Sequence, residues 1–127
     1  MNGLHLTADL RGCRCDLVWL TDADRLLAAC VQRVRDNGLQ AVAQLGHRFP
    51  DTPKGPGGVT ATVLLAESHL CVHTWPESRS VSLDVYVCNF GADHSARAQQ
   101  LMDALLAQFE PGEALRRSVD RGAAPAA

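Results

Sequence analysis

Residues 80–88 read SVSLDVYVC and show the most regular two-residue alternation in the chain. A period of two is that of a β-strand whose successive side chains point to opposite faces of a sheet. One face is apolar and the other polar, with Val81, Leu83, Val85 and Val87 on the first and Ser82, Asp84, Tyr86 and Cys88 on the second. The segment predicts a sheet with one face in a core and a polar face that meets solvent, a ligand or another subunit.

The segments on either side predict five more strands and two helices. Strands are expected at residues 4–10, where His5 and Asp9 join the polar face, and at 39–45, 59–66, 70–74 (after a break near Ser68) and 115–119. One helix is expected to begin at an N-cap on Thr21 and end at Asn37-Gly38, and the other to run from Asp93 or Ser95 to Phe109. This order predicts an α+β fold, a two-layer sandwich of a mainly antiparallel sheet with two helices on one face. The tail from Gly122 to Ala127 is expected to be frayed.

Composition narrows the function classes. A chain of 127 residues is expected to form one domain, residues 1–127. A net charge of −2 without a basic cluster predicts no nucleic-acid partner, and the lack of a long apolar run predicts no membrane span. No signal peptide is recognisable, so the default is a cytoplasmic protein whose five cysteines are free thiols. Cys13 and Cys15 lack a second pair or a nearby histidine, so no metal site is expected.

Chemically active side chains are concentrated in residues 67–77, ESHLCVHTWPE. Composition alone favours a strand end with polar residues at a turn. A serine hydrolase, with Ser68 as nucleophile, His73 or His69 as base and Asp84 as orienting carboxylate, is a second reading. The chain has no Gly-x-Ser-x-Gly elbow to support it.

A resemblance favours a different chemistry. The run AESHLCVHTWPE, followed by SLDVYVC, resembles the prokaryotic S-adenosylmethionine decarboxylase proenzymes and their relatives that decarboxylate other amino acids. Matching segments also occur at residues 5–6, 47–49, 58–60 and 120–122, so the resemblance covers almost the whole chain. In that family the backbone cleaves itself at a Glu-Ser bond, here Glu67-Ser68. The resemblance implies a β chain of residues 1–67 and an α chain of residues 68–127.

The resemblance also assigns roles to single residues. Ser68 becomes a pyruvoyl group that forms a Schiff base with the substrate amine and draws in electrons as carbon dioxide leaves. His73 matches the processing base, and Cys88 matches the proton donor. Thr60 stands where the family has a serine whose hydroxyl assists processing. A pyruvoyl group replaces pyridoxal phosphate, which fits a chain whose only lysine is Lys54 in a loop.

The substrate is less sharply defined. Phe49 and Glu77 match positions associated with adenine and ribose, which favours S-adenosylmethionine and a role in spermidine synthesis. The alternative is L-arginine or L-ornithine in polyamine synthesis, for which Asp51, Asp9 or Glu77 would bind the distal cation. Two departures motivate it: Gly46 where relatives have phenylalanine, and a longer loop that contains Asp51 and Lys54.

Two further expectations concern partners. The family dimerises, so the resemblance implies a homodimer of cleaved αβ protomers in an αββα four-layer arrangement. A non-catalytic paralogue that regulates an active partner is the rival from another class. Retention of Ser68, His73 and Cys88 argues against it, because a binding module needs none of the three.

Overall fold

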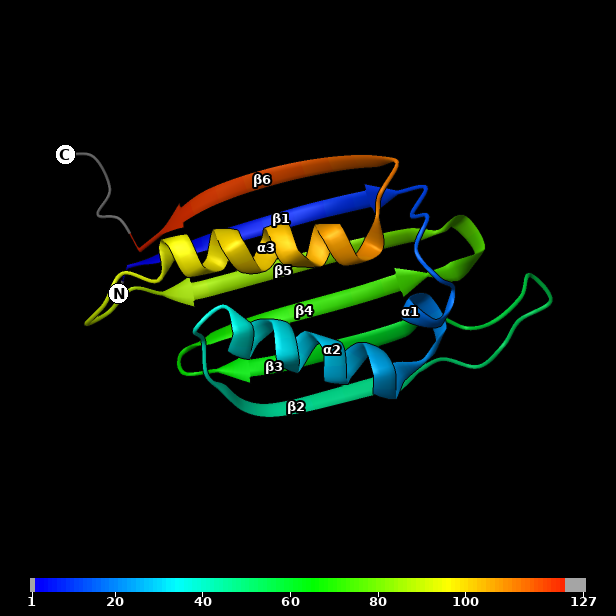
Figure 1. Ribbon diagram of the computed structural model, residues 1–127, viewed down its shortest axis with the longest axis horizontal. Helices are drawn as coiled ribbons and strands as arrows, with labels where there is room; N and C mark the ends of the chain where they lie inside the picture. Colours follow the sequence, from blue (N-terminus) through cyan, green and yellow to red (C-terminus); the bar gives the residue numbers. More distant parts are fainter. Residues whose placement is uncertain (1, 123–127) are drawn as a thin grey trace.

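Six antiparallel strands form one sheet in the order β2-β3-β4-β5-β1-β6, as Figure 1 shows. The structure is a computed structural model and describes residues 2–122. The strands are β1 (Gly3–Arg11), β2 (Ala41–Arg48), β3 (Val59–Leu65), β4 (Ser68–Trp75), β5 (Ser80–Cys88) and β6 (Glu113–Arg121). The predicted α+β class and antiparallel sheet are therefore confirmed.

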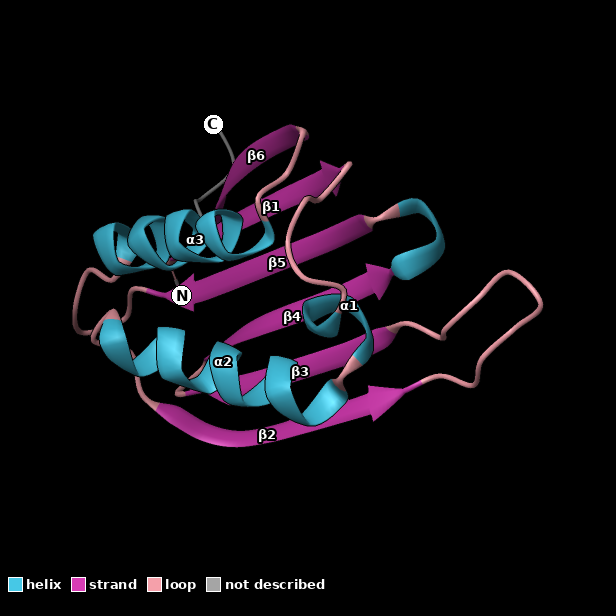
Figure 2. Cartoon of the chain, turned by 45° about the vertical axis from the view of Figure 1, so that its right-hand side comes forward, coloured by secondary structure: helices cyan, strands magenta, loops and turns pink. Residues whose placement is uncertain are grey.

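Two long helices cover the same face of the sheet and leave the other face bare (Figures 1 and 2). Helix α2 (Ala23–Asp36) packs on β2 and β3, and α3 (Ser95–Phe109) packs on β1 and β5. A short helix α1 (Val18–Thr21) precedes α2, and a 3-10 turn η1 (Pro76–Ser78) joins β4 to β5. The bare side is called the open face below.

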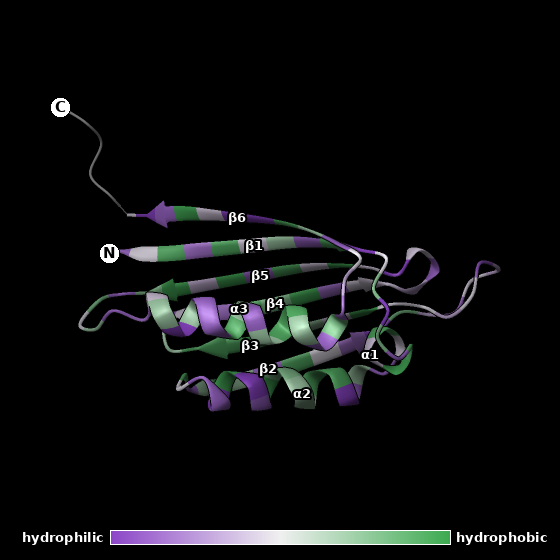
Figure 3. Ribbon diagram, turned by 45° about the horizontal axis from the view of Figure 1, so that its top comes forward, coloured by the Kyte–Doolittle hydropathy of each residue, from purple (hydrophilic) through white to green (hydrophobic). Residues whose placement is uncertain are grey.

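The alternation in β5 separates core from open face as the sequence predicts. Val81, Leu83, Val85 and Val87 are each at most 2% exposed, and Ser82, Asp84 and Tyr86 between them are partly exposed on the open face. Figure 3 shows the same alternation of hydropathy along the strands. Burial of the apolar rows under α2 and α3 supplies the main driving force for this fold.

The predicted start of the first helix is wrong. Thr21 ends α1, and its hydroxyl donates to the Leu17 carbonyl. Asp22 is the N-cap of α2, because its carboxylate accepts the Arg25 N–H at 3.0 Å. The extra turn of α1 already makes residue 21 helical, so its hydroxyl serves the preceding turn rather than the next helix. The predicted end at Asn37-Gly38 is confirmed, with Gly38 at φ 76°.

Two strand boundaries also differ from the predictions. The strand expected at 39–45 runs from Ala41 to Arg48, because the Leu39 N–H still bonds to the Val34 carbonyl at the end of α2. Ser68 does not interrupt a strand but begins β4, after a two-residue turn at Ala66-Glu67. The last strand is longer than expected at both ends. Residues 123–127 of the tail predicted to fray lie outside the described residues.

The cysteines and the helix lengths agree with the expectations from composition. All five cysteines are free, and four of them are buried. Burial raises the pKa of the Cys13 thiol to about 11 and that of Cys30 to about 12, so both are protonated at neutral pH. Within residues 2–122, none of the helices has the length and apolar character needed to cross a bilayer.

Candidate active site

The predicted cleavage bond lies in a tight hairpin turn between β3 and β4. Leu65 pairs with Ser68, so Ala66 and Glu67 alone make the turn. Glu67 has φ 53°, in the left-handed region that residues other than glycine rarely adopt. The backbone just before Ser68 is therefore held in a sparsely populated conformation.

Ser68 is anchored to the end of β5. Its Oγ accepts the backbone N–H of Cys88 at 2.9 Å. Cys88 is 9% exposed, and with Glu67, Tyr86 and Phe90 it lines a hollow of about 440 Å³. Glu67, Ser68 and Cys88 thus lie together, and this set is called the turn-end group.

A second set of predicted residues gathers at the other end of β4. The Thr60 hydroxyl lies 2.9 Å from His73 Nδ1, across the β3–β4 pair. Both residues line a cavity of about 680 Å³, a size that suits a small-molecule ligand. Phe49, Trp75 and Glu77 line the same cavity. This set is called the loop-end cavity.

The long loop after Phe49 forms one wall of the loop-end cavity. Gly57 and Gly58 let it approach closely, since a Cβ there would clash with the carbonyl oxygens of Phe49 and Thr74. Asp51 fastens the loop by accepting the Gly57 N–H and by pairing with Arg48 at 2.7 Å. These hydrogen bonds, the Gly57 one first, hold the pKa of the Asp51 carboxyl below its usual range.

The two sets do not meet within one chain. Ser68 and His73 are five residues apart on one extended strand, so about 16 Å separates their backbones. They also fall on opposite faces of β4, by its alternation. Among the described residues no imidazole is hydrogen-bonded to Ser68 Oγ, so the serine hydrolase arrangement is not formed.

The structure distinguishes the three carboxylates that are candidates to bind the distal cation of arginine or ornithine. Asp51 forms an ion pair with Arg48. Asp9 lies on β1, away from the cavity, and forms an ion pair with Arg117 at 3.2 Å. Glu77 is exposed, lines the cavity and remains for a ligand. Gly46 lies beside Ala23 and Leu27 of α2, so a phenylalanine there would face the helix layer rather than the cavity.

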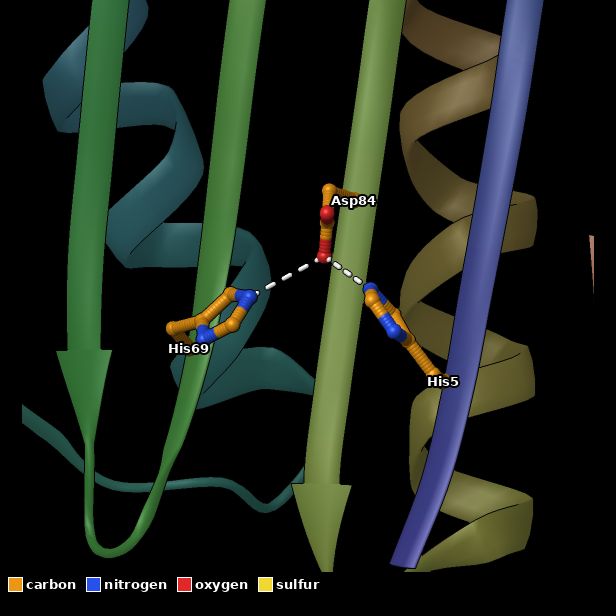
Figure 4. A group of neighbouring side chains, drawn as sticks. All are labelled: His5, His69 and Asp84. Carbon is orange, nitrogen blue, oxygen red and sulfur yellow. Dashed lines mark hydrogen bonds and ion pairs between the residues drawn. The ribbon is translucent and has the colours of Figure 1, made fainter. Parts of the chain in front are cut away.

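The structure brings together one cluster of side chains that the sequence does not predict as a site. His5 Nε2 and His69 Nε2 both contact Asp84 Oδ1, at 2.7 and 3.0 Å (Figure 4). The side chains come from three adjacent strands, β1, β4 and β5, on the open face. Period-two patterns placed His5 and Asp84 on the polar face, but only the strand order and register bring the three together.

Comparisons with known proteins identify the family of this chain. A family model described as S-adenosylmethionine decarboxylase matches residues 4–122. The S-adenosylmethionine decarboxylase proenzyme of Persephonella marina is 33% identical, over 97% of this chain and 84% of its own. That of Aquifex aeolicus is 33% identical, over 94% of this chain and 81% of its own.

A solved structure agrees as well. The crystal structure of the adenosylmethionine decarboxylase of Aquifex aeolicus matches with a TM-score of 0.79 and 30% identity, over 97% of this chain and 92% of that one. The family model and the relatives match nearly the entire chain, and the solved structure has the same fold. The chain belongs to the S-adenosylmethionine decarboxylase family of pyruvoyl-dependent decarboxylases.

Proposed function

We propose that this chain cleaves itself between Glu67 and Ser68 and then decarboxylates S-adenosylmethionine, which supplies the aminopropyl donor for spermidine synthesis. The main observation in support of the proposal is the position of Ser68. It follows a left-handed Glu67 directly, and its Oγ is fixed beside the backbone of Cys88. A nucleophile, a strained peptide and a thiol residue therefore meet at one point.

The turn-end group suits the cleavage step. A left-handed conformation at a residue other than glycine costs about 1–3 kcal/mol, and cleavage of the bond after Glu67 relieves it. Ser68 Oγ attacks the Glu67 carbonyl carbon, converting the amide to an ester. Loss of the Ser68 α-proton then expels the Glu67 carboxylate and leaves dehydroalanine at residue 68. Water hydrolyses the imine form of this residue to a pyruvoyl group, and the nitrogen leaves as ammonia.

The residues around Ser68 fit such a group. The Cys88 N–H that now meets Ser68 Oγ can donate to an oxygen at the same place. The pyruvoyl group supplies an electron sink for decarboxylation without pyridoxal phosphate or a metal. Cys88, close to residue 68, is the proposed proton donor to the product carbon.

The predicted processing base, His73, would come from a second copy of the chain. Removal of the Ser68 α-proton requires a base within hydrogen-bond reach, and His73 of the same chain is about 16 Å away. In a two-fold dimer, contacts occur twice with the partners exchanged. If two open faces pack together, the turn-end group of each protomer meets the loop-end cavity of the other, and Thr60 and His73 act across the interface.

The open face has the character of such an interface. Leu45, Leu64, Leu115 and Val119 lie on it with exposed fractions of 49% or more. Leu45 and Leu64 lie at one edge of the sheet and Leu115 and Val119 at the other, so they add apolar area at both sides of a face-to-face contact. Packing two sheets face to face would give the αββα four-layer dimer of cleaved αβ protomers.

Features of the loop-end cavity support S-adenosylmethionine over arginine or ornithine. Phe49 and Trp75 are 48% and 44% exposed and present ring faces that an adenine or a sulfonium can contact. Glu77 offers a carboxylate to the ribose hydroxyls. Arginine or ornithine would use Glu77 but would have no ring or sulfonium to place against the two aromatic side chains.

Mass spectrometry of the purified chain, followed by carbon dioxide release assays, tests the proposal. We expect fragments of residues 1–67 and 68–127, the second blocked by pyruvoyl, and turnover of S-adenosylmethionine in preference to L-arginine and L-ornithine. One intact chain without activity would support a regulatory paralogue and overturn the proposal. Turnover of arginine or ornithine alone would leave the cleavage intact and overturn the substrate.

A further inference from the structure

The hydrogen-bond network on the open face extends over four side chains. Arg121 Nη1 lies 3.1 Å from His5 Nδ1, His5 contacts Asp84, and Asp84 contacts His69. His69 is the residue immediately after Ser68. The network therefore ties the residue next to the reacting group to two neighbouring strands.

The direction of the hydrogen bonds follows from Arg121. A guanidinium can only donate, so His5 Nδ1 accepts and His5 Nε2 carries the proton. His5 then donates to Asp84 Oδ1, and His69 Nε2 donates to the same oxygen. This tautomer disfavours metal binding by His5, because a ligating Nε2 would have to be unprotonated. The cluster is better suited to holding His69 than to holding an ion.

Cleavage changes what holds residue 68 in place. In the uncut chain the Ala66-Glu67 turn fixes Ser68 from the N-terminal side. Once the bond is cut, residue 68 becomes a chain end, and strand ends fray unless other contacts retain them. Ser68 Oγ leaves with the Glu67 carboxylate, so its hydrogen bond from the Cys88 N–H is lost as well. The contacts that remain are the strand pairing and the His69–Asp84 hydrogen bond.

We infer that His69, Asp84 and His5 are positioning residues, which pin the newly cut start of β4 so that the group at residue 68 stays beside Cys88. This inference rests on the proposed self-cleavage. The hydrogen bond is strengthened by its charged acceptor, the Asp84 carboxylate, which receives N–H donors from both His69 and His5. His69 also lies beside Tyr86, with ring centroids 5.8 Å apart.

The test compares His69→Leu with His69→Gln. Glutamine places an N–H near the position of Nε2 and can still donate to Asp84, whereas leucine cannot. Asp84→Asn, which keeps the shape but removes the charge, is the second variant should leucine impair folding. Asp103→Asn is the matched control, because Asp103 lies on α3, on the other side of the sheet from the network, and pairs with Arg116.

Three readouts are taken from each variant: the cleaved fraction by mass spectrometry, hydrogen exchange of amides 69–72 in the cleaved protein, and kcat with KM. We expect His69→Leu to be cleaved, to exchange these amides about tenfold faster and to lose about tenfold in kcat with KM nearly unchanged. Asp84→Asn should shift both readouts in the same direction, and His69→Gln and Asp103→Asn should match the wild type.

Failure of the positioning role and failure of the proposed function would give different results. Wild-type exchange and kcat in both His69→Leu and Asp84→Asn would overturn the positioning role while leaving the proposed function intact. A wild-type chain that is never cleaved would instead overturn the proposed function, and with it the basis of the inference.

Discussion

The two ends of β4 divide the chemistry of this protein between them. The turn end holds the cleavage bond, Ser68 and Cys88 in a strained hairpin. The other end, about 16 Å away, holds Thr60 and His73 beside a cavity with exposed aromatic side chains and Glu77. The first end holds the residue proposed to become the reactive group, whereas the predicted processing base lies at the other end. The second has a base and a binding cavity but no reactive group.

Under the proposed function, a single protomer would carry two half-sites rather than one site. A strand cannot fold back to join its own ends while it stays paired in the sheet. The proposed two-fold dimer would join each half-site to the complementary half-site of the partner, so that residues on one short strand could take part in one reaction.

Complementation between two inactive variants gives the largest expected effect. Ser68→Ala alone and His73→Ala alone should each give uncut, inactive protein. When the two are co-expressed, mixed dimers contain one site with an intact Ser68 facing an intact His73. With random pairing, about a quarter of the wild-type number of sites should be intact. Mass spectrometry should find cleaved His73→Ala chains only in the mixture.

The control for this experiment is co-expression of Ser68→Ala with Cys88→Ala. Both changes lie in the turn-end group, so no mixed site contains both intact residues and decarboxylation should not recover. Failure of the first pair to restore any cleavage would contradict a site shared between protomers.

The substitution Glu77→Gln tests whether the loop-end cavity binds the substrate, and its expected effect on the kinetics is intermediate in size. Loss of a charged hydrogen bond to the substrate should raise KM for S-adenosylmethionine about tenfold and leave the extent of cleavage unchanged. Steady-state kinetics on the cleaved protein measures it. Glu113→Gln, on β6 and away from the cavity, is the control. Loss of cleavage in Glu77→Gln would contradict this prediction, because it would show that Glu77 is needed for self-cleavage as well as for substrate binding.

Asp51→Asn tests the loop wall and should have the smallest effect. The folded-state pKa of Asp51 is lowered, so its ionic contribution to loop order is present above the ordinary value of 3.8 and is lost as the pH falls through the lowered value. At neutral pH, asparagine mimics the protonated state, and we expect KM to rise about two- to threefold.

Proteolysis provides a direct measure of the same loop. Lys54 is the only lysine, so a lysine-specific protease has a single site in the chain. Asp51→Asn should be nicked faster there, while Asp36→Asn, which perturbs an ion pair on α2, should not. Equal nicking rates in all three proteins would show that Asp51 does not order the loop.

Much of the fold was predictable because the periods of hydrophobic residues are local. The alternation in 80–88 and the apolar stripe from Ala98 to Leu105 need no tertiary information to be read as strand and helix. The predictions failed at ends: Thr21 was overridden by an extra helical turn, and residues 46–48 remain extended because β3 is there to pair with them. Boundaries depend on partners that are distant in sequence.

The sequence by itself predicted most of the secondary structure, the family and a set of candidate reactive residues, because local side-chain patterns and the ESHLCVHTWPE motif carry that information. Only the tertiary structure decided where those residues stand relative to one another. Strand order and register join His5, His69 and Asp84 from three strands, whereas the extended backbone of β4 separates Ser68 from His73. Residues close in sequence are far apart along a strand, and residues far apart in sequence become neighbours across a sheet.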